Sequence, residues 1–414
     1  MFVAGVLGYL FQLLVTRKLT VAEYGELQSL IGLLGLLSIS AVMLGNFIGR
    51  YTAVIGVAHD AAATRGFLSW LNRRCVIIVP IGFTAYLALM PLVARYLHLP
   101  SVVGLACIGV VAVFTIFSIG YTNILTGWGN FTSTNTSLVV GACLKLAAGI
   151  VIVMLSATAN AAALAIIIGA VGSWFVLRMS ARRTIGSGPT TDWRTVYFAG
   201  LDLRKTVLPI FFFSFTSGLV GSVGILLVKN LTSATTAGYY GVLTLFGSVF
   251  VMVSSAIAQV TRRAVCAAEY REAGSGRRPL GMAYLLIIAM SVIGIVAYAT
   301  LPQLIINAVV GAKYVAVAPD LWLFGVSASV MSLLFLEVTL AYARNDLWIS
   351  AMLAMTVVLI GLTTYVFHAT IRAIVLDSIL SLSVGYVGAF IFNQVRRKQC
   401  LQPPAPVEVA TPVI

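Results

Sequence analysis

The chain has 414 residues, of which 60% are hydrophobic and only 9% are charged. Soluble domains carry about 25% charged residues, so this composition excludes a soluble enzyme, a disordered chain and a secreted disulfide scaffold. The 26 Lys and Arg outnumber the 12 Asp and Glu, an excess that we assign to cytoplasmic loops beside an anionic leaflet and not to nucleic acid.

The predicted elements are long apolar runs without polar alternation, which are typical of membrane helices and not of barrel strands. In the first half they cover residues 1–19, 27–49, 76–94, 102–125, 136–156 and 160–178. In the second half they cover residues 206–228, 238–260, 281–301, 320–342, 347–367 and 373–394. The first run lacks a basic leader and a cleavage site, so we predict an uncleaved span.

These runs predict an all-α polytopic membrane protein with about twelve transmembrane helices. A six-helix bundle over 1–178 is followed by a cytoplasmic linker loop over 179–205, in which the stretch Gly186–Thr190 is rich in helix-breaking residues. A second six-helix bundle covers 206–394, and a Pro-rich tail over 395–414 is predicted to be disordered. Most Lys and Arg then lie on the side of both termini, which predicts cytoplasmic termini in a prokaryotic inner (plasma) membrane.

Short patterns recur between the halves at nearly one offset. Tyr24–Gly25 matches Tyr240–Gly241, Tyr96 matches Tyr314, and Asn130 matches Asn345, which are offsets of 216, 218 and 215 residues. Because each half has an even number of spans, the halves have parallel topology and are related by an axis along the membrane normal. This predicts two bundles around a central cavity, the architecture of an alternating-access transporter.

Several blocks resemble the polysaccharide (O-antigen type) flippase family of the multidrug/oligosaccharidyl-lipid/polysaccharide exporter superfamily. They are Gly8–Leu19 with Glu23–Tyr24–Gly25, Ala237–Gly241, Gly311–Tyr314 with Pro319, and Leu340–Asn345. The resemblance implies a transporter, and not an enzyme, that moves a lipid-linked oligosaccharide across the membrane for cell-surface polysaccharide biosynthesis. The implied partners are a polyprenyl-pyrophosphate-linked oligosaccharide, membrane lipids, and a polysaccharide polymerase with glycosyltransferases.

Intramembrane charges are candidate functional residues because a charge at a span centre is costly. Lys145 is the most deeply placed cation and is predicted to bind the pyrophosphate; the alternative is a lysine that reaches the interface along its long stem. Glu337 is predicted to bind substrate or a coupling proton or cation, or else to pair with Arg344. Asp377 is a second candidate for ion coupling, with interfacial exposure or pairing with Arg372 as the alternative.

Basic residues near span ends could guide phosphate at either mouth of the cavity, and we assign Arg17, Lys18 and Arg50 to substrate binding. Ordinary interfacial anchoring is the alternative for these three and for Lys229. No cofactor or metal site is expected, because the five cysteines form no closely spaced pair.

Two other functions share this architecture or location. A small-molecule or drug/cation antiporter of the same superfamily would have the same fold, although the first half has no clear intramembrane acid. A membrane glycosyltransferase or polymerase would need a large outer loop or an acidic cluster, and the predicted outer loops are short.

Overall fold

The computed structural model describes residues 2–57, 60–186, 188–191, 203–271, 277–343 and 347–399. These residues form helices and no strands, and eleven of the helices are long and apolar enough to cross a membrane. A further helix at the N-terminus, of 17 residues, is shorter than these eleven. The predicted all-α polytopic membrane fold is confirmed.

The first half contains α1 (Phe2–Lys18), α2 (Val21–Val57), α3 (Ala61–Tyr96), α4 (Val103–Gly127), α5 (Phe131–Leu155) and α6 (Ala159–Ile185). The second half contains α8 (Leu203–Leu231), α9 (Ala234–Arg271), α10 (Arg277–Thr300), α12 (Leu321–Ala343), α13 (Leu347–Val366) and α14 (Ile371–Gln399). Between α10 and α12 lie the short α11 (Pro302–Val309) and the 3-10 helix η1 (Ala312–Asp320).

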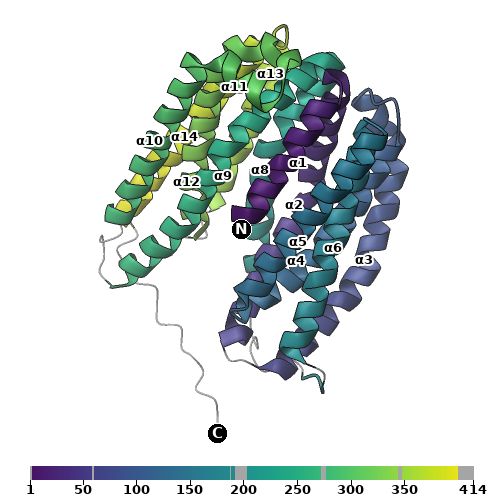
Figure 1. Cartoon of the computed structure of the whole chain (residues 1–414). Helices are drawn as coiled ribbons and strands as arrows, with labels where there is room; N and C mark the ends of the chain where they lie inside the picture. The colour runs from purple at the N-terminus through teal and green to yellow at the C-terminus, as the bar shows by residue number, and fades with distance from the viewer. Residues whose placement is uncertain are drawn as a thin grey trace.

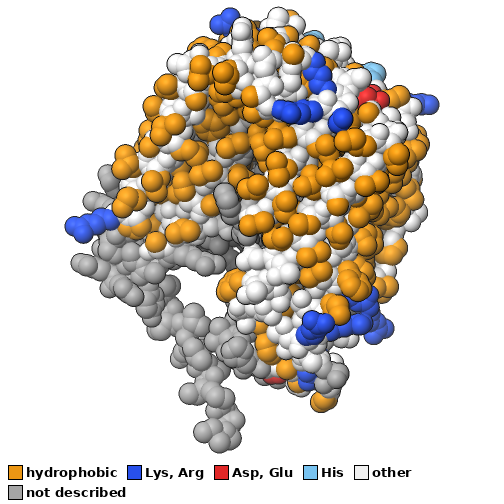
Figure 2. All heavy atoms as spheres, viewed as in Figure 1, with side chains coloured by type: hydrophobic (Ala, Val, Ile, Leu, Met, Phe, Trp, Pro, Cys, Tyr) orange, Lys and Arg blue, Asp and Glu red, His pale blue; other side chains and the backbone are white. Residues whose placement is uncertain are grey.

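The two halves form two bundles that meet at the upper end of Figure 1 and diverge toward the lower end. Figure 2 shows the surface hollowed between the bundles toward that lower end. One hydrophobic core includes residues of both halves, such as Phe11, Tyr24 and Tyr314. The core around Phe67 belongs only to the first half, and the cores around Leu353 and Leu336 only to the second. The shared core therefore holds the bundles together at one end.

The seam between the bundles is built on an antiparallel contact of α2 with α8. Small residues let the two backbones approach: a Cβ on Gly35 would meet Ser222, and a Cβ on Gly218 would meet Ile39. Farther toward the lower end, the Asn46 amide donates a hydrogen bond to Ser214 Oγ at 3.1 Å.

The helices of the two halves follow the same order. α2 and α9 begin at Val21 and Ala234, an offset of 213 residues, and α4 and α12 begin at Val103 and Leu321, an offset of 218. By helix start, Gly25 therefore corresponds to Gly238 and not to Gly241. Gly25 and Gly238 lie against each other where α2 crosses α9, since a Cβ on Gly25 would lie 2.6 Å from Gly238 N.

Several helices extend beyond the predicted spans. α3 begins at Ala61, where the Asp60 side chain accepts a hydrogen bond from Ala63 N at 2.9 Å, so the segment between the predicted spans 27–49 and 76–94, with Arg65, Arg73 and Arg74, is largely helical and not a loop. α6 continues to Ile185, and Arg65 Nη1 donates to the carbonyl of that last residue at 2.9 Å. Hydropathy selects only the apolar part of a helix, so the predicted spans do not include these polar ends.

Other boundaries bear on the predicted domains. α8 begins at Leu203, and α14 runs to Gln399, so both helices reach into segments that the sequence assigns to the linker and the tail. Residues 192–202 of the predicted linker and 400–414 of the predicted tail lie outside the described residues.

Candidate functional site

Two adjoining cavities lie at the seam, where α2 of the first half meets α8, α9, α12, α13 and α14 of the second. Their volumes are about 440 and 280 Å³, and together we call them the seam cavity. Both are lined by Gly35, Val220, Gly221, Val251 and Met331. The larger one adds Gln28, Ser222, Tyr240, Thr244, Ser248, Phe324, Ser327 and Ser378, among others.

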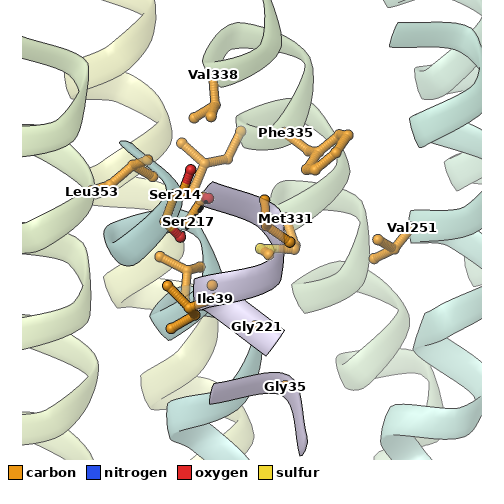
Figure 3. A pocket seen from close by; sticks show the side chains of 14 residues that line it. Gly35, Ile39, Ser214, Ser217, Gly221, Val251, Met331, Phe335, Val338 and Leu353 are labelled. Atoms are coloured by element: carbon orange, nitrogen blue, oxygen red, sulfur yellow. Dashed lines mark hydrogen bonds between the residues drawn. The ribbon is translucent and has the colours of Figure 1, made fainter. Parts of the chain in front are cut away.

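The wall of the seam cavity combines apolar side chains with hydroxyl groups. Figure 3 shows the smaller part, in which Ser214, Ser217 and Ile39 lie on one side and Met331 and Phe335 on the other. None of the described residues that line either part carries a charged side chain. Such a wall can bind a mostly apolar molecule and orient it through a few hydrogen bonds.

Gly221 and Tyr240 were not selected as site residues from the sequence. The repeat of Gly218, Gly221 and Gly224 along α8 suggests close helix packing, and Gly218 does pack in this way against Ile39. A Cβ on Gly221 would meet nothing within 4 Å, so this glycine leaves space in the cavity instead. Tyr240 and Ser378 both line the larger part of the cavity. Periodicity alone could not separate the packing glycine from the one that lines the cavity.

Lys145 lies in a different place, within the first bundle. It is the fifteenth residue of α5, about 21 Å along the helix from Phe131, and its side chain is half-buried. Its Nζ lies over the Phe11 ring, 5.0 Å from the centroid, and none of the described residues accepts a hydrogen bond from it. An open groove of about 450 Å³ between α1, α5 and α6 includes Lys145 with Gly5, Gly141 and Gly169.

The two candidate acids lie in the second bundle, and both are buried. Glu337 is 3% exposed, and its carboxylate accepts a hydrogen bond from the Asn393 amide, which also donates to the Glu337 carbonyl at 3.2 Å. Asp377 is 6% exposed and accepts from Thr364 Oγ1 at 2.9 Å. Interfacial exposure of Asp377, the alternative drawn from the sequence, is wrong.

The two acids are far from each other, and each adjoins a different part of the seam cavity. Asn393, the partner of Glu337, is 16 residues after Asp377 on α14, about 24 Å along the helix. Asp377 immediately precedes Ser378, which lines the cavity. Glu337 immediately precedes Val338, which lines the smaller part, so each acid is adjacent in the chain to a residue of the cavity wall.

The basic residues near span ends do not converge on one site. Arg17 and Lys18 are exposed at the upper end, and Arg17 binds backbone carbonyls of α11. The side chain of Arg50 lies outside the described residues. Lys229 is only 2% exposed and interacts electrostatically with Glu26, so interfacial anchoring of Lys229 is wrong.

Comparison with known proteins gives no match to a family model and no match to a curated protein. Solved structures match over nearly the whole chain. One is an outward-facing multidrug resistance MATE family transporter of the MOP superfamily, with a TM-score of 0.62 and 15% identity, covering 96% of this chain and 94% of that one. Another is the MATE multidrug transporter DinF-BH, solved as a complex, with a TM-score of 0.63, 14% identity and coverages of 96% and 93%.

A third match is a MOP superfamily transporter from Pyrococcus furiosus whose binding pocket is described as having reverse polarity. Its TM-score is 0.61, with 15% identity and coverages of 97% and 94%. At these identities the similarity shows the fold. The chain therefore has the fold of the MATE transporters, a multi-pass membrane fold of two bundles around a central seam.

Proposed function

We propose that this protein is an alternating-access transporter of the MOP superfamily type, and that the seam cavity binds its substrate. The observation that carries the proposal is the position of this cavity, between two bundles that are joined at one end and diverge at the other. A site at such a seam can face either side if the bundles rock about it. Transport then requires only that substrate or a coupling ion favours one state over the other.

The substrate that fits this cavity is a small, uncharged amphipathic molecule. The larger part, at about 440 Å³, is within the size range of sites for drug-like ligands. A buried ion would need a counter-charge, and none of the described lining residues supplies one. Tyr240, Ser222 and Ser378 supply hydrogen-bonding groups, and Phe324 and Met331 supply apolar contact.

Three probes of similar shape and different charge test this preference. Triphenylphosphine oxide is neutral, tetraphenylphosphonium is a cation and tetraphenylborate is an anion. Binding to the purified protein in nanodiscs would be followed by quenching of tryptophan fluorescence, with empty nanodiscs as the control for partitioning into lipid. We expect saturable binding of the neutral probe and weaker binding of both ions. Tighter binding of the cation than of the neutral probe would contradict the substrate assignment.

A lipid-linked oligosaccharide is the second candidate substrate, and the structural similarity to multidrug transporters supports it less well than a small molecule. The observation in its favour is the groove of Lys145, where a cation without a described hydrogen-bond partner lines an open space. An anionic pyrophosphate would be a suitable ligand for such a lysine. The polymerase and glycosyltransferases implied by the sequence resemblance would be partners of this protein only if it transports a lipid-linked oligosaccharide.

Translocation of a labelled polyprenyl-pyrophosphate-linked oligosaccharide in proteoliposomes tests this second candidate. If it is correct, Lys145→Met abolishes most of the translocation, while Arg95→Ala, which removes one positive charge at an exposed position, leaves it intact. No translocation by the unmodified protein would exclude it.

We also propose that Asp377 is the ion-coupling residue of the transporter, in preference to Glu337. A carboxylate that carries a proton or cation must communicate with the substrate site, and Asp377 adjoins Ser378 and interacts electrostatically with Tyr240, both of which line the cavity. Glu337 also adjoins a cavity residue, Val338, but its carboxylate is hydrogen-bonded to Asn393 between α12 and α14. A driving gradient of protons or sodium across proteoliposomes would identify the coupled ion.

A further inference from the structure

The upper end of the seam is joined by hydrogen bonds that run from cations to the ends of helices. Arg17, at the end of α1, donates from Nε to Val309 O at 3.0 Å and from a terminal nitrogen to Ala308 O. These acceptors are the last two residues of α11, in the other half. In return, Lys313 of η1 donates from Nζ to Arg17 O at 3.1 Å and to Leu19 O.

The acceptors are groups that a helix leaves without partners. The last four carbonyls of an α-helix have no intrahelical donor, and they carry the partial negative charge of the helix dipole. Arg17 satisfies such carbonyls at the end of α11, and Lys313 satisfies those at the end of α1. We call these two cations and the helix ends that they cap the reciprocal clamp.

Neighbouring residues fix the geometry of the reciprocal clamp. Gly311, with φ of 102°, forms the turn between α11 and η1 that leads to Lys313. Tyr314 is fully buried, packs edge-on against Tyr24 with ring centroids 6.2 Å apart, and donates to Thr16 O at 3.4 Å. Tyr314 therefore secures the same two segments beneath the charged layer.

We propose that the reciprocal clamp is the gate that holds the upper end of the seam closed, and that Arg17 and Lys313 are gating residues of the transport cycle. This inference rests on the proposed alternating access. Both side chains lie at the exposed edge of the seam, so water can replace the protein carbonyls when the bundles separate there. The clamp therefore favours the state in which the upper end is closed, and it can still open because water solvates both cations after separation.

The gate proposal assigns Arg17 a role different from that expected from the sequence. Its guanidinium is occupied by backbone carbonyls and does not point at the seam cavity. Lys18, the next residue, is also exposed, and none of the described residues accepts a hydrogen bond from its Nζ. Lys18 therefore provides a matched control that removes the same charge at the same end without breaking the clamp.

The test measures the separation of the bundles at both ends. Spin labels would be attached through Val102→Cys and Leu301→Cys, two exposed upper-end positions on opposite halves. A second pair, Arg183→Cys and Arg278→Cys, reports on the lower end. The five native cysteines would be replaced by serine, and distances would be measured by double electron–electron resonance in nanodiscs.

We expect Arg17→Ala or Lys313→Ala to raise the ratio of upper-open to upper-closed molecules about tenfold, because each removes two charge-assisted hydrogen bonds that water can partly replace. Distances at the lower end should shorten in parallel. Lys18→Ala should leave both distributions unchanged, and Arg17→Lys should restore part of the closed population. Elution as a single monodisperse peak would verify that each variant is folded, and Arg17→Gln would replace a variant that is not.

Equal distributions in Arg17→Ala and Lys18→Ala would overturn the gate proposal. The neutral probe, triphenylphosphine oxide, separates this failure from that of the proposed function. If the distances shift but the probe does not bind, the gate stands and the substrate assignment fails. If the probe binds and the distances do not shift, the seam cavity stands as the binding site and the gate does not.

Discussion

The seam cavity can be tested by filling it from Gly221. Replacement of Gly221 by leucine adds four carbon atoms where a Cβ meets nothing within 4 Å, so the fold should tolerate the change. These atoms occupy on the order of 100 Å³ if each takes about the 30 Å³ of a water molecule, against a larger cavity of about 440 Å³. A bound molecule then loses contacts equivalent to roughly four heavy atoms.

At roughly 0.3 kcal/mol per ligand atom, that loss amounts to about 1.2 kcal/mol, or nearly a tenfold rise in Kd. Titration of the neutral probe into Gly221→Leu measures it. Gly281→Leu is the matched control, because Gly281 is also an exposed helical glycine whose Cβ would meet nothing within 4 Å, but it lies on α10 away from the cavity. Equal probe affinity in the two variants, with equal thermal stability, would refute the placement of the binding site.

Three other substitutions follow from particular contacts. Glu337→Ala should lower the free energy of unfolding by about 1–3 kcal/mol, because it leaves the buried Asn393 amide short of an acceptor. Glu337→Gln keeps an acceptor oxygen, so chemical denaturation should show a much smaller decrease in the free energy of unfolding for this variant. Asp377→Asn should abolish any dependence of transport on an ion gradient while the probe affinity stays the same, and an unaltered dependence would reject Asp377 as the coupling residue. Gly238→Val should destabilise the fold by about 1–3 kcal/mol through overpacking, because a Cβ there would clash with the Val21 carbonyl. Thermal unfolding measures this change, and an unchanged melting temperature would contradict the close crossing of α2 and α9.

The membrane spans were predictable because each depends on the composition of one continuous segment. A run such as 102–125 is apolar enough by itself to indicate a membrane helix, and α4 covers Val103–Gly127. The polar ends of helices were not predictable in the same way. Arg65 lies in the first turns of α3 because Asp60 caps that helix and because its guanidinium reaches the end of α6, and hydropathy registers neither contact.

The candidate site was predictable only in part, because sequence reasoning selects charges and this cavity is built without them. The search for intramembrane charges correctly picked residues in costly environments, since Glu337 and Asp377 are buried and Lys145 is half-buried. It could not show that these residues lie apart, or that serine, tyrosine and glycine residues from α2, α8, α9, α12 and α14 converge. Such residues carry little signal individually, and only their convergence makes a binding surface.

Composition and hydropathy alone determined that this protein is a helical membrane protein, because the bilayer constrains every spanning segment separately. The tertiary structure decided where Arg17 acts. In the sequence it is a basic residue at a span end, suited to a phosphate ligand or to the membrane interface. In the folded chain, α11 and η1 of the other half reach α1, nearly 300 residues away along the chain, and exposed helix carbonyls become its ligands.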